Sequence, residues 1–329
     1  MPRILVVAPN WIGDALMAQP LLARLREKRH NLAIDALAPA WVAPVLRRMA
    51  EISEVIETDL RHGALELRAR WRLGRSLRAR RYDQAIVLPN SWKSALVPFF
   101  ADIALRSGYA GESRFGLLNL VYRNGGERAP MALHYARLSE KPGTAPREPL
   151  PQPTLRVDVH AAAATARRFG LPGRYAVLCP GAEFGAAKRW PEFAGLAARL
   201  RLPVVLLGSD RDREACAGIA GRNLAGETTL DEAIELIAGA AFVVSNDSGL
   251  MHVAAALGTP QVALFGSSSP LHTPPLSDRA RVVWLGIECS PCYARECPLG
   301  HLRCLREIPV ERVLGEIDAL NRSQHSGSE

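Results

Sequence analysis

Residues 242–266 read FVVSNDSGLMHVAAALGTPQVALFG, and this stretch of the chain decides the fold class. The apolar run 242–245 leads into a polar turn, after which small, helix-forming residues continue as far as Gly258 and Pro260. A second apolar run follows at 261–265. A strand, a turn, a helix and a second strand at this spacing predict a βαβ unit, whose two strands pair in parallel.

The polar turn of this unit, Asn246-Asp247-Ser248-Gly249, is expected at the carboxyl end of the strand and the amino end of the helix. Open parallel sheets bind ligands at that edge, and the free N–H groups of a helix start favour anions. The turn and the nearby His252 are therefore predicted to meet a ligand. Two structural alternatives stay open: Asp247 is the N-cap of the helix, and His252 is a packed helix residue.

The same alternation of strand and helix continues along the chain. Further strands are expected at 4–8, 32–37, 85–88, 175–179 and 204–207. Further helices are expected at 15–29, 43–49, 65–80, 161–169, 191–200, 213–219 and 310–320. Strands that alternate with helices predict parallel sheets covered by helices on both faces.

Length and proline content predict two such domains. A chain of 329 residues exceeds the usual size of a single core. Five prolines between 142 and 153 indicate a linker, because proline interrupts helices and central strands. We therefore expect doubly wound, Rossmann-like domains at 1–155 and 156–320 that face each other across a cleft, followed by a disordered polar tail at 321–329.

Composition limits the class of protein. Hydrophobic residues make up 48% of the chain and the mean hydropathy is near zero, which is typical of a globular protein. The apolar runs are too short for a transmembrane helix or a signal peptide, so we expect a cytoplasmic protein. The net charge of +8 indicates an acidic partner without choosing among nucleic acid, phosphorylated lipid and nucleotide.

Arginine is concentrated in one segment, where Glu66 alone offsets the charge, at positions 61, 68, 70, 72, 75, 78, 80 and 81. A solvated helix and a role at an anionic surface explain this pattern equally well. Trp71 and Tyr82 are the aromatic residues in or beside the segment, so stacking of nucleic-acid bases is poorly supported.

The loop after the first strand, Pro9-Asn10-Trp11-Ile12-Gly13-Asp14, is a second candidate site. It lacks the G-x-G-x-x-G fingerprint, which argues against a nicotinamide cofactor, and it lacks the P-loop lysine. Gly13 permits a ligand to approach closely. Asp14 stands at the expected helix start, where spacing alone favours an N-cap over a general base.

Two more loops follow strands in the second half. Lys188 and Arg189 lie between glycines and a helix that starts with proline, an arrangement suited to a diphosphate. An exposed basic loop is the alternative. Asp212 and Glu214 follow the next strand, where carboxylates accept hydrogen bonds from adenosine or, equally, cap a helix.

Four cysteines are closely spaced near the end of the second half, in the pattern Cys289-x2-Cys292-x4-Cys297-x6-Cys304. In a cytosolic protein this spacing favours a metal over disulfides, although it is irregular for a zinc knuckle. Structural zinc, redox-labile disulfides and free thiols all stay open, and no catalytic role is assigned to the cluster.

Four segments in order and spacing resemble the bacterial ADP-heptose:lipopolysaccharide heptosyltransferases, and most of all the heptosyltransferase II group. They are the loop 10–14, the segment LPNSWKSA at 88–95, the loop 181–190 and SNDSGLMH at 245–252. The resemblance runs from the first strand to about residue 315. It implies the GT-B fold, with the acceptor on the first domain and the nucleotide sugar on the second.

The resemblance also implies a reaction and a set of residue roles. L-glycero-D-manno-heptose would pass from ADP-heptose to the first heptose of the lipopolysaccharide inner core with inversion, Asp14 acting as the base. Lys188 would neutralise the leaving diphosphate, with no metal or other cofactor required. The implied donor site comprises Gly181, Lys188, Asp212, Glu214, Asp247, Ser248, Gly249, Leu250 and His252. The implied acceptor site comprises Gly13, Asn90, Ser91 and Lys93.

The implied partners are ADP-heptose and a phosphorylated lipid A-core acceptor, met by a peripheral monomer at the inner face of the inner membrane. The arginine segment would then face the phosphates of that surface. A nucleotide-sugar epimerase of the same fold is the first alternative, and it would act on the donor alone. A basic nucleic-acid-binding protein is the second, but it leaves the Lys188 and Asp247 loops unexplained.

Overall fold

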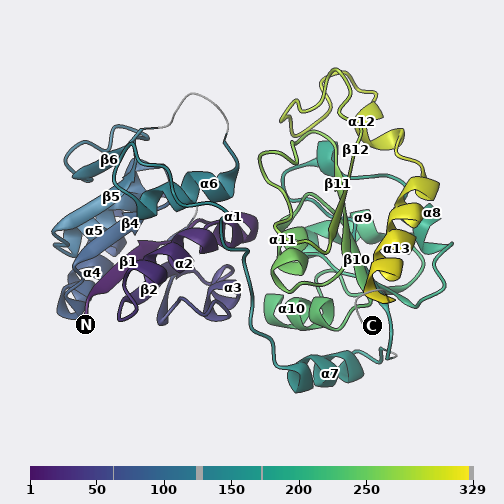
Figure 1. The fold of residues 1–329 in the computed structure, drawn as a ribbon, viewed down its shortest axis with the longest axis horizontal. Helices are drawn as coiled ribbons and strands as arrows, with labels where there is room; N and C mark the ends of the chain where they lie inside the picture. Colours follow the sequence, from purple (N-terminus) through teal and green to yellow (C-terminus); the bar gives the residue numbers. More distant parts are fainter. Residues whose placement is uncertain (62, 124–128, 172, 326–329) are drawn as a thin grey trace. The chain divides into compact units, whose positions relative to one another are not determined.

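A computed structural model describes residues 1–61, 63–123, 129–171 and 173–325 (Figure 1). The chain divides into two compact units, Met1–Gln152 (unit 1) and Pro153–Glu329 (unit 2). Each unit contains a six-stranded sheet, and in the described residues neighbouring strands pair in parallel. The α/β fold class predicted from the sequence is confirmed, while the ligand assigned to each domain stays a prediction.

Unit 1 has the strand order β3-β2-β1-β4-β5-β6, which places the first strand at the centre of the sheet. Its ladders align Val7 with Leu37 and with Val87, so the carboxyl ends of β1, β2 and β4 meet at one edge. The strands are β1 Arg3–Val7, β2 Ala33–Pro39, β3 Glu54–Thr58, β4 Gln84–Val87, β5 Leu105–Tyr109 and β6 Leu120–Tyr122.

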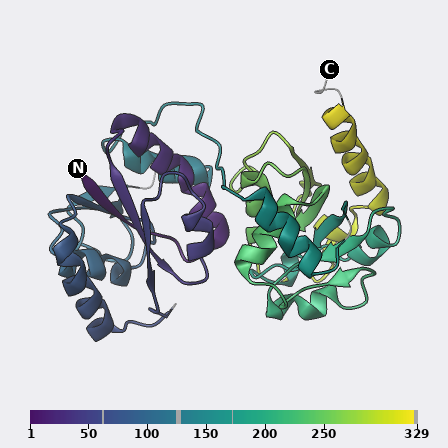
Figure 2. The same cartoon turned by 90° about the horizontal axis from the view of Figure 1, so that it is seen from below.

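Helices cover both faces of this sheet. Leu5, Val7 and Ala85 pack on one face with Leu77 of α4 and Val97 of α5. In Figure 2 the strands lie between the purple helices α1 and α2 on one side and the blue helix α4 on the other. The helices are α1 Ile12–Met17, α2 Gln19–Lys28, α3 Ala43–Arg47, α4 Leu67–Leu77, η1 Arg78–Arg80, η2 Trp92–Ala95, α5 Leu96–Phe100, α6 Met131–Ala136 and η3 Arg137–Ser139.

Unit 2 repeats the plan with the order β12-β11-β10-β7-β8-β9. Its central pair joins Ser245 of β10 to Cys179 of β7, and Asn246 lies beside Leu264 of β11. The opening βαβ prediction is confirmed, because β10 and β11 pair in parallel. The strands are β7 Ala176–Cys179, β8 Val204–Leu206, β9 Arg222–Asn223, β10 Phe242–Asn246, β11 Gln261–Phe265 and β12 Ala280–Trp284.

The core of unit 2 joins one face of its sheet to the last helices. Leu178 and Val244 pack with Phe193 of α8, Leu305 of α12 and Ile317 of α13. The helices are α7 Val159–Arg168, η4 Ala186–Lys188, α8 Phe193–Ala197, η5 Asp210–Asp212, α9 Arg213–Cys216, α10 Leu230–Ala238, α11 Gly249–Ala256, α12 Arg303–Arg306 and α13 Val310–His325.

Several predicted helices differ from the structure; those expected at 191–200 and 213–219, for example, end at Ala197 and Cys216. The helix expected at 15–29 is divided at Ala18, because Pro20 lacks an N–H group and fits only the first turn of a new helix. α13 continues to His325, so the disordered tail is wrong for residues 321–325, and 326–329 lie outside the described residues. None of the described helices has the length and hydropathy that a bilayer crossing requires.

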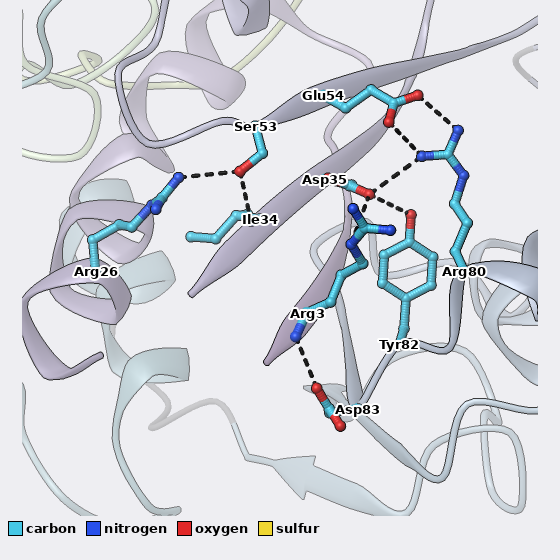
Figure 3. Close-up of polar contacts among 9 residues, drawn as sticks. All are labelled: Arg3, Arg26, Ile34, Asp35, Ser53, Glu54, Arg80, Tyr82 and Asp83. Atoms are coloured by element: carbon cyan, nitrogen blue, oxygen red, sulfur yellow. Dashed lines mark hydrogen bonds and ion pairs between the residues drawn. The ribbon is translucent and has the colours of Figure 1, made fainter. Parts of the chain in front are cut away.

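An ion network around the buried Asp35 and Tyr82 links the amino ends of β1, β2 and β4 in unit 1 (Figure 3). The carboxylate of Asp35 accepts a 2.7 Å hydrogen bond from Tyr82 and lies 3.4 Å from Arg80 and 3.8 Å from Arg3. Arg80 also forms a two-pronged pair with Glu54 and lowers the pKa of that carboxylate. These groups lie away from the carboxyl edge, and their role is structural.

Candidate functional site

Three loops meet at the carboxyl edge of the unit 2 sheet, where the strand order reverses between β7 and β10. One follows β7 and contains Lys188. The second follows β10 and contains Asp247, and the third follows β11 and contains Ser268. Such a reversal point opens a crevice outside the strand ends, where open α/β sheets bind ligands. The topology therefore brings together loops that lie far apart in sequence.

Lys188 and Asp247 form the charged centre of this loop set. The ammonium of Lys188 lies 2.5 Å from Oδ2 of Asp247, and their side chains are 16% and 5% exposed. Ser268 donates a second hydrogen bond of 2.5 Å to the same carboxylate oxygen. The Lys188 ammonium also lies 4.9 Å from the ring centre of Phe184, within the range of cation–π attraction. These contacts fix the position of the cation.

Asn246 joins the β10 loop to the β7 loop. Its side-chain oxygen Oδ1 accepts a hydrogen bond from the backbone N–H of Trp190 at 3.0 Å, and its side-chain nitrogen Nδ2 donates one to the backbone oxygen of Pro180 at 2.7 Å. All of these groups are buried. The sequence placed Asn246 in the predicted turn without a role of its own, although an amide at the last position of a buried strand is a recognisable signal.

The start of α11 supplies backbone donors beside the ion pair. Ser248 is the N-cap, so the N-cap alternative for Asp247 is wrong. The first N–H groups of a helix have no carbonyl partner within it, and here they belong to the turn around Ser248, Gly249 and Leu250. This helix end carries partial positive charge, which favours an anion.

His252 is buried one turn into α11. The pKa of its imidazole is lowered to about 4, chiefly by burial; the charge of Asp247 opposes this shift and that of Lys188 adds to it. His252 is therefore neutral at pH 7. The structural alternative of a packed helix residue describes this position, and any contact with a donor phosphate stays a prediction.

Gly181 and Asp212 are packed against each other. A Cβ atom at residue 181 would lie 2.2 Å from Cγ of Asp212, so only glycine fits. Asp212 accepts hydrogen bonds from Ser209 N and Oγ at 2.9 and 2.8 Å in a capping box. Glu214 is exposed in the short helix that follows. Asp212 thus has the capping role left open by the sequence, and adenosine binding by either residue stays a prediction.

Asp14 lies in the first turn of α1 at the carboxyl edge of the unit 1 sheet. The N-cap is Trp11, so the capping alternative is wrong for Asp14. The side chain is half-buried, as is Gly13. Its negative charge adds to burial in raising the pKa of the neighbouring Tyr135. A partly exposed carboxylate beside a buried phenol fits the predicted base, whose role stays a prediction.

Asn90, Ser91 and Lys93 lie on the loop after β4 at the same edge of unit 1, with Asn90 exposed and the other two half-buried. Two buried arginines hold this loop, mainly through its backbone, and Arg114 also lies 3.4 Å from Oδ1 of Asn90. Arg114 donates to the carbonyl of Pro89 at 2.6 Å. Arg70 donates to the carbonyl of Lys93 at 3.2 Å. The contacts leave the Lys93 ammonium to act elsewhere, because only its backbone oxygen is used by Arg70.

Comparison with known proteins decides the family. The model of glycosyltransferase family 9 (heptosyltransferase) matches residues 70–303. The chain is 46% identical to lipopolysaccharide heptosyltransferase 2 of Escherichia coli, over 97% of this chain and 98% of that protein. It is 44% identical to lipooligosaccharide heptosyltransferase 2 of Haemophilus influenzae, over 97% and 99%. The chain belongs to glycosyltransferase family 9.

A solved structure supports the same family. The structure of Escherichia coli ADP-heptose lps heptosyltransferase II matches with a TM-score of 0.88 and 44% identity, covering 98% of this chain and 99% of that one. The two Rossmann-like units are therefore those of the GT-B fold. Both the family and the fold expected from the four sequence motifs are confirmed, and the protein is a glycosyltransferase.

Within this family member, the arginine segment does not act as one surface. Arg70 is buried against backbone carbonyls, Arg78 donates to the carbonyl of Phe100 at 3.0 Å, and Arg80 pairs with Glu54. Arg61 pairs with Glu66. The exposed arginines on α4 itself are 68, 72 and 75. The segment is therefore part structural and part exposed.

The four clustered cysteines lie in unit 2 and surround one small void of about 20 Å³. The void is not in the sheet but beside the Lys188 loop, since Ala187 and Ser267 also line it. None of the six cysteines, all of which lie in the described residues, is joined in a disulfide. The other two, Cys179 at the end of β7 and Cys216 in α9, are buried elsewhere in unit 2 and do not line this void.

Sequence reasoning missed several residues that complete the candidate sites. Ser268 bonds directly to the predicted donor residue Asp247, and Asn246 bonds to Pro180 and Trp190 in the loop that carries Lys188. Arg114 contacts the predicted acceptor loop, mainly through its backbone. For Ser268 a signal exists in the sequence, because Gly-Ser-Ser-Ser follows an apolar strand. For Arg114 there is none, since an isolated arginine does not show whether it is buried.

Proposed function

We propose that this protein is an inverting heptosyltransferase that moves L-glycero-D-manno-heptose from ADP-heptose to the first heptose of the lipopolysaccharide inner core. The full-length identity of 46% with a lipopolysaccharide heptosyltransferase 2 supports this substrate pair. The observation that carries the proposal is the Lys188–Asp247 pair beside the start of α11. It combines a cation with helix N–H donors at a ligand-binding edge of the sheet.

On the donor side, Lys188 binds the diphosphate together with the N–H groups around Ser248, Gly249 and Leu250. Asp247 is a positioning residue that holds the Lys188 ammonium, while Ser268 shares its negative charge. Neutral His252 packs behind this loop. As the glycosidic bond breaks, negative charge grows on ADP, and a fixed cation and helix dipole stabilise it without reorganising. The proposal gives this role to protein groups and assigns no part of the transfer to a metal.

The transfer itself is a single displacement. The carboxylate of Asp14 takes the proton of the acceptor hydroxyl, whose oxygen forms a bond to the anomeric carbon of heptose. The bond from that carbon to the β-phosphate oxygen breaks, and ADP leaves with the electron pair. Attack from the side opposite the leaving group inverts the anomeric centre. Asn90, Ser91, Lys93 and the close approach allowed at Gly13 would orient the acceptor.

The reaction tests the proposal directly. Purified protein is incubated with ADP-heptose and an acceptor that ends in the first core heptose, and ADP and the glycan mass are measured. We expect ADP release with the gain of one heptose on the acceptor. ADP release with no change in acceptor mass would contradict it. Sedimentation equilibrium in the same buffer checks the expected monomer.

The same assay without acceptor addresses the epimerase alternative. An epimerase converts the nucleotide sugar alone, so a changed donor sugar in this arm would replace the transferase proposal. A transferase leaves the donor unchanged apart from slow hydrolysis. Nucleic-acid binding predicts salt-sensitive retention of DNA or RNA, which we do not expect at physiological salt.

We further propose that the protein works in the cytoplasm as a peripheral protein on the inner face of the inner membrane, where a lipid A-linked acceptor is anchored. Arg68, Trp71, Arg72 and Arg75 form one exposed stripe on α4, at the i, i+3, i+4 and i+7 spacing of a helix face. Arg75 lies 5.7 Å from the Trp71 ring centre. Basic side chains and an exposed indole suit an anionic lipid surface.

Vesicle sedimentation tests this surface. The unaltered protein is expected to bind vesicles that contain anionic lipid and to be released by salt. Replacing Arg68, Arg72 and Arg75 with glutamine removes about 1 kcal/mol per arginine of surface attraction. A matched control removes the same charge from unit 2 at Arg167, Arg279 and Arg281, which are also exposed. Equal loss in both variants would show general electrostatics and would contradict the α4 surface.

A further inference from the structure

The segment between β12 and α12 is long for a loop without regular structure. Residues 285–302 are all described and contain neither helix nor strand. Structureless loops longer than about 12–15 residues are uncommon in compact domains unless they are functional or disordered. Small or loop-rich elements often depend on a disulfide or a metal to hold them. This loop carries Cys289, Cys292 and Cys297, and Cys304 follows it in α12.

The four thiols gather around one point of this loop. They line the void of about 20 Å³ together with His301, Pro298 and Leu299. A void of this size has room for about one water-sized group. Cys292 is exposed and Cys289 and Cys297 are half-buried, so three of the four are not core residues. Hydrophobic packing therefore does not explain why four cysteines converge there.

Two residues beside the cysteines have a left-handed backbone conformation that residues other than glycine rarely adopt. Tyr293, directly after Cys292, has φ of 54°, and Leu302 has φ of 51°. Non-glycine residues in this left-handed region persist where surrounding contacts hold them, often at functional sites. The Leu302 N–H donates to the sulfur of Cys297 at 3.4 Å. An N–H group aimed at a cysteine sulfur is the type of outer contact that supports a metal-bound thiolate.

We propose that Cys289, Cys292, Cys297 and Cys304 bind one thiophilic divalent cation, Zn²⁺ or Fe²⁺, in a tetrahedral four-sulfur site. This donor set is typical of both metals, and each thiol that binds releases its proton to solvent. As they are placed, no three or more His, Cys, Asp or Glu side chains of the described residues are arranged to hold a metal ion. The thiols must therefore rotate about their Cα–Cβ bonds, between staggered positions, to complete the shell.

The role of this ion is to hold the loop against the rest of unit 2. Ala187 donates to the carbonyl of Arg295 at 3.0 Å, and Tyr293 donates to the carbonyl of Ser267 at 2.7 Å. At Gly185 a Cβ atom would lie 2.4 Å from the Arg295 oxygen, so the two loops are in close backbone contact. The cysteine loop thus supports the turn that carries Lys188. Its effect on donor binding rests on the proposed function, but metal binding does not.

Metal analysis of the full chain tests the site without an activity measurement. Protein purified without chelators is measured by inductively coupled plasma mass spectrometry, and we expect about one zinc or iron per chain. Protein reconstituted with Co²⁺ is expected to show sulfur-to-cobalt charge-transfer and tetrahedral ligand-field bands. Iron would be identified by its own absorption spectrum and metal ratio. A chain that holds no metal and takes up neither Zn²⁺ nor Co²⁺ overturns the proposal.

Variants separate this site from general thiol effects. Cys292→Ser changes an exposed ligand and is expected to lower the metal affinity at least tenfold, because changing even a residue that only supports a metal ligand typically costs about 10–100-fold. Cys216→Ala changes a buried thiol outside the cluster and is expected to keep the metal. Cysteines found paired as disulfides by mass spectrometry in non-reduced protein would overturn the proposal. If metal is present but heptose transfer is absent, the metal site stands and the proposed function fails.

Discussion

The candidate side chains of unit 2 bond to one another, whereas those of unit 1 lie on a loop that two buried arginines hold in place. Lys188, Asp247 and Ser268 form one connected charged group at the end of three strands. In the loop of Asn90 to Lys93, the buried Arg114 and Arg70 donate mainly to backbone carbonyls, and Arg114 also lies 3.4 Å from Oδ1 of Asn90. In unit 2 the candidate side chains position one another. In unit 1 they are positioned by buried arginines that are not themselves candidate ligand contacts.

This difference matches the ligands proposed for the two units. A diphosphate is small and has fixed charge, so a prearranged cation and helix end can meet it with little loss of entropy. A lipid-linked oligosaccharide is large and carries many hydroxyls. A loop fixed by its backbone, with side chains left toward solvent, can contact such an acceptor at several points. The predictions below test whether the two sites act in these separate ways.

The largest effect is expected from Asp14→Asn, which removes the proposed base while keeping the shape of the side chain. We expect kcat to fall by about 10²–10⁴-fold, the usual contribution of a general base. The affinity for ADP, measured by calorimetry, is expected to stay unchanged because Asp14 lies in unit 1. As a control, Asp102→Asn changes an exposed carboxylate of the same unit and is expected to keep full activity. Substantial transfer by the Asp14 variant would remove it as the base.

Lys188→Ala is expected to weaken both donor binding and the chemical step. Loss of one charge-stabilising donor typically lowers kcat by about 10²–10³-fold. The unpaired Asp247 then faces the diphosphate and repels it. The double variant Lys188→Ala with Asp247→Asn removes this repulsion and is expected to recover part of the ADP affinity. If the double variant bound ADP more weakly than the single variant, the positioning role of Asp247 would be contradicted.

The pH dependence of the free energy of unfolding tests whether His252, beside the proposed donor site, is buried away from water. The pKa of His252 is about 4 in the folded protein and is ordinarily near 6.5, so the unfolded chain binds the proton more readily between these values. The free energy of unfolding is therefore full above pH 6.5 and falls as the pH drops toward 4, by an amount on the order of 3 kcal/mol.

Chemical denaturation at a series of pH values measures this loss. His252→Gln is expected to remove most of the slope between pH 6.5 and 4, whereas His160→Gln, at an exposed position of the same unit, is expected to leave it unchanged. An identical slope in the unaltered protein and in the His252 variant would show that other groups control acid stability.

The smallest effect is expected from Lys93→Ala. It removes one charged contact to the acceptor, about 1.5 kcal/mol or roughly tenfold in the KM for acceptor. The KM for ADP-heptose is expected to stay constant, because Lys93 belongs to the acceptor loop. Lys141→Ala, an exposed lysine of the same unit, serves as the control. A change in donor KM alone would break the proposed division between the two loops.

Strand periodicity predicted the central strands well and the edge strands poorly. β1, β7, β10 and β11 are nearly uninterrupted apolar runs, because both faces of a central parallel strand are buried. The four edge strands β3, β6, β9 and β12 were missed, and so was β5, which lies beside β6. The residues of β3 and β12 are mostly half-buried or exposed, and no continuous apolar run spans either sequence. The break at Ala18 was predictable in principle, since Pro20 marks a new helix start.

The sequence alone determined the fold class, the family and the loops that carry the candidate residues, because each loop directly follows a recognisable buried strand. Tertiary structure decided which of those residues meet. The pairing of Lys188 with Asp247, the clamp made by Asn246 and the burial of Arg70 and Arg114 all join segments separated along the chain. The order of strands in a sheet sets such contacts, and local patterns do not encode that order. For the stretch at 242–266, the sequence predicted the position of the turn. The strand order of the sheet brought Lys188 next to Asp247 in that turn.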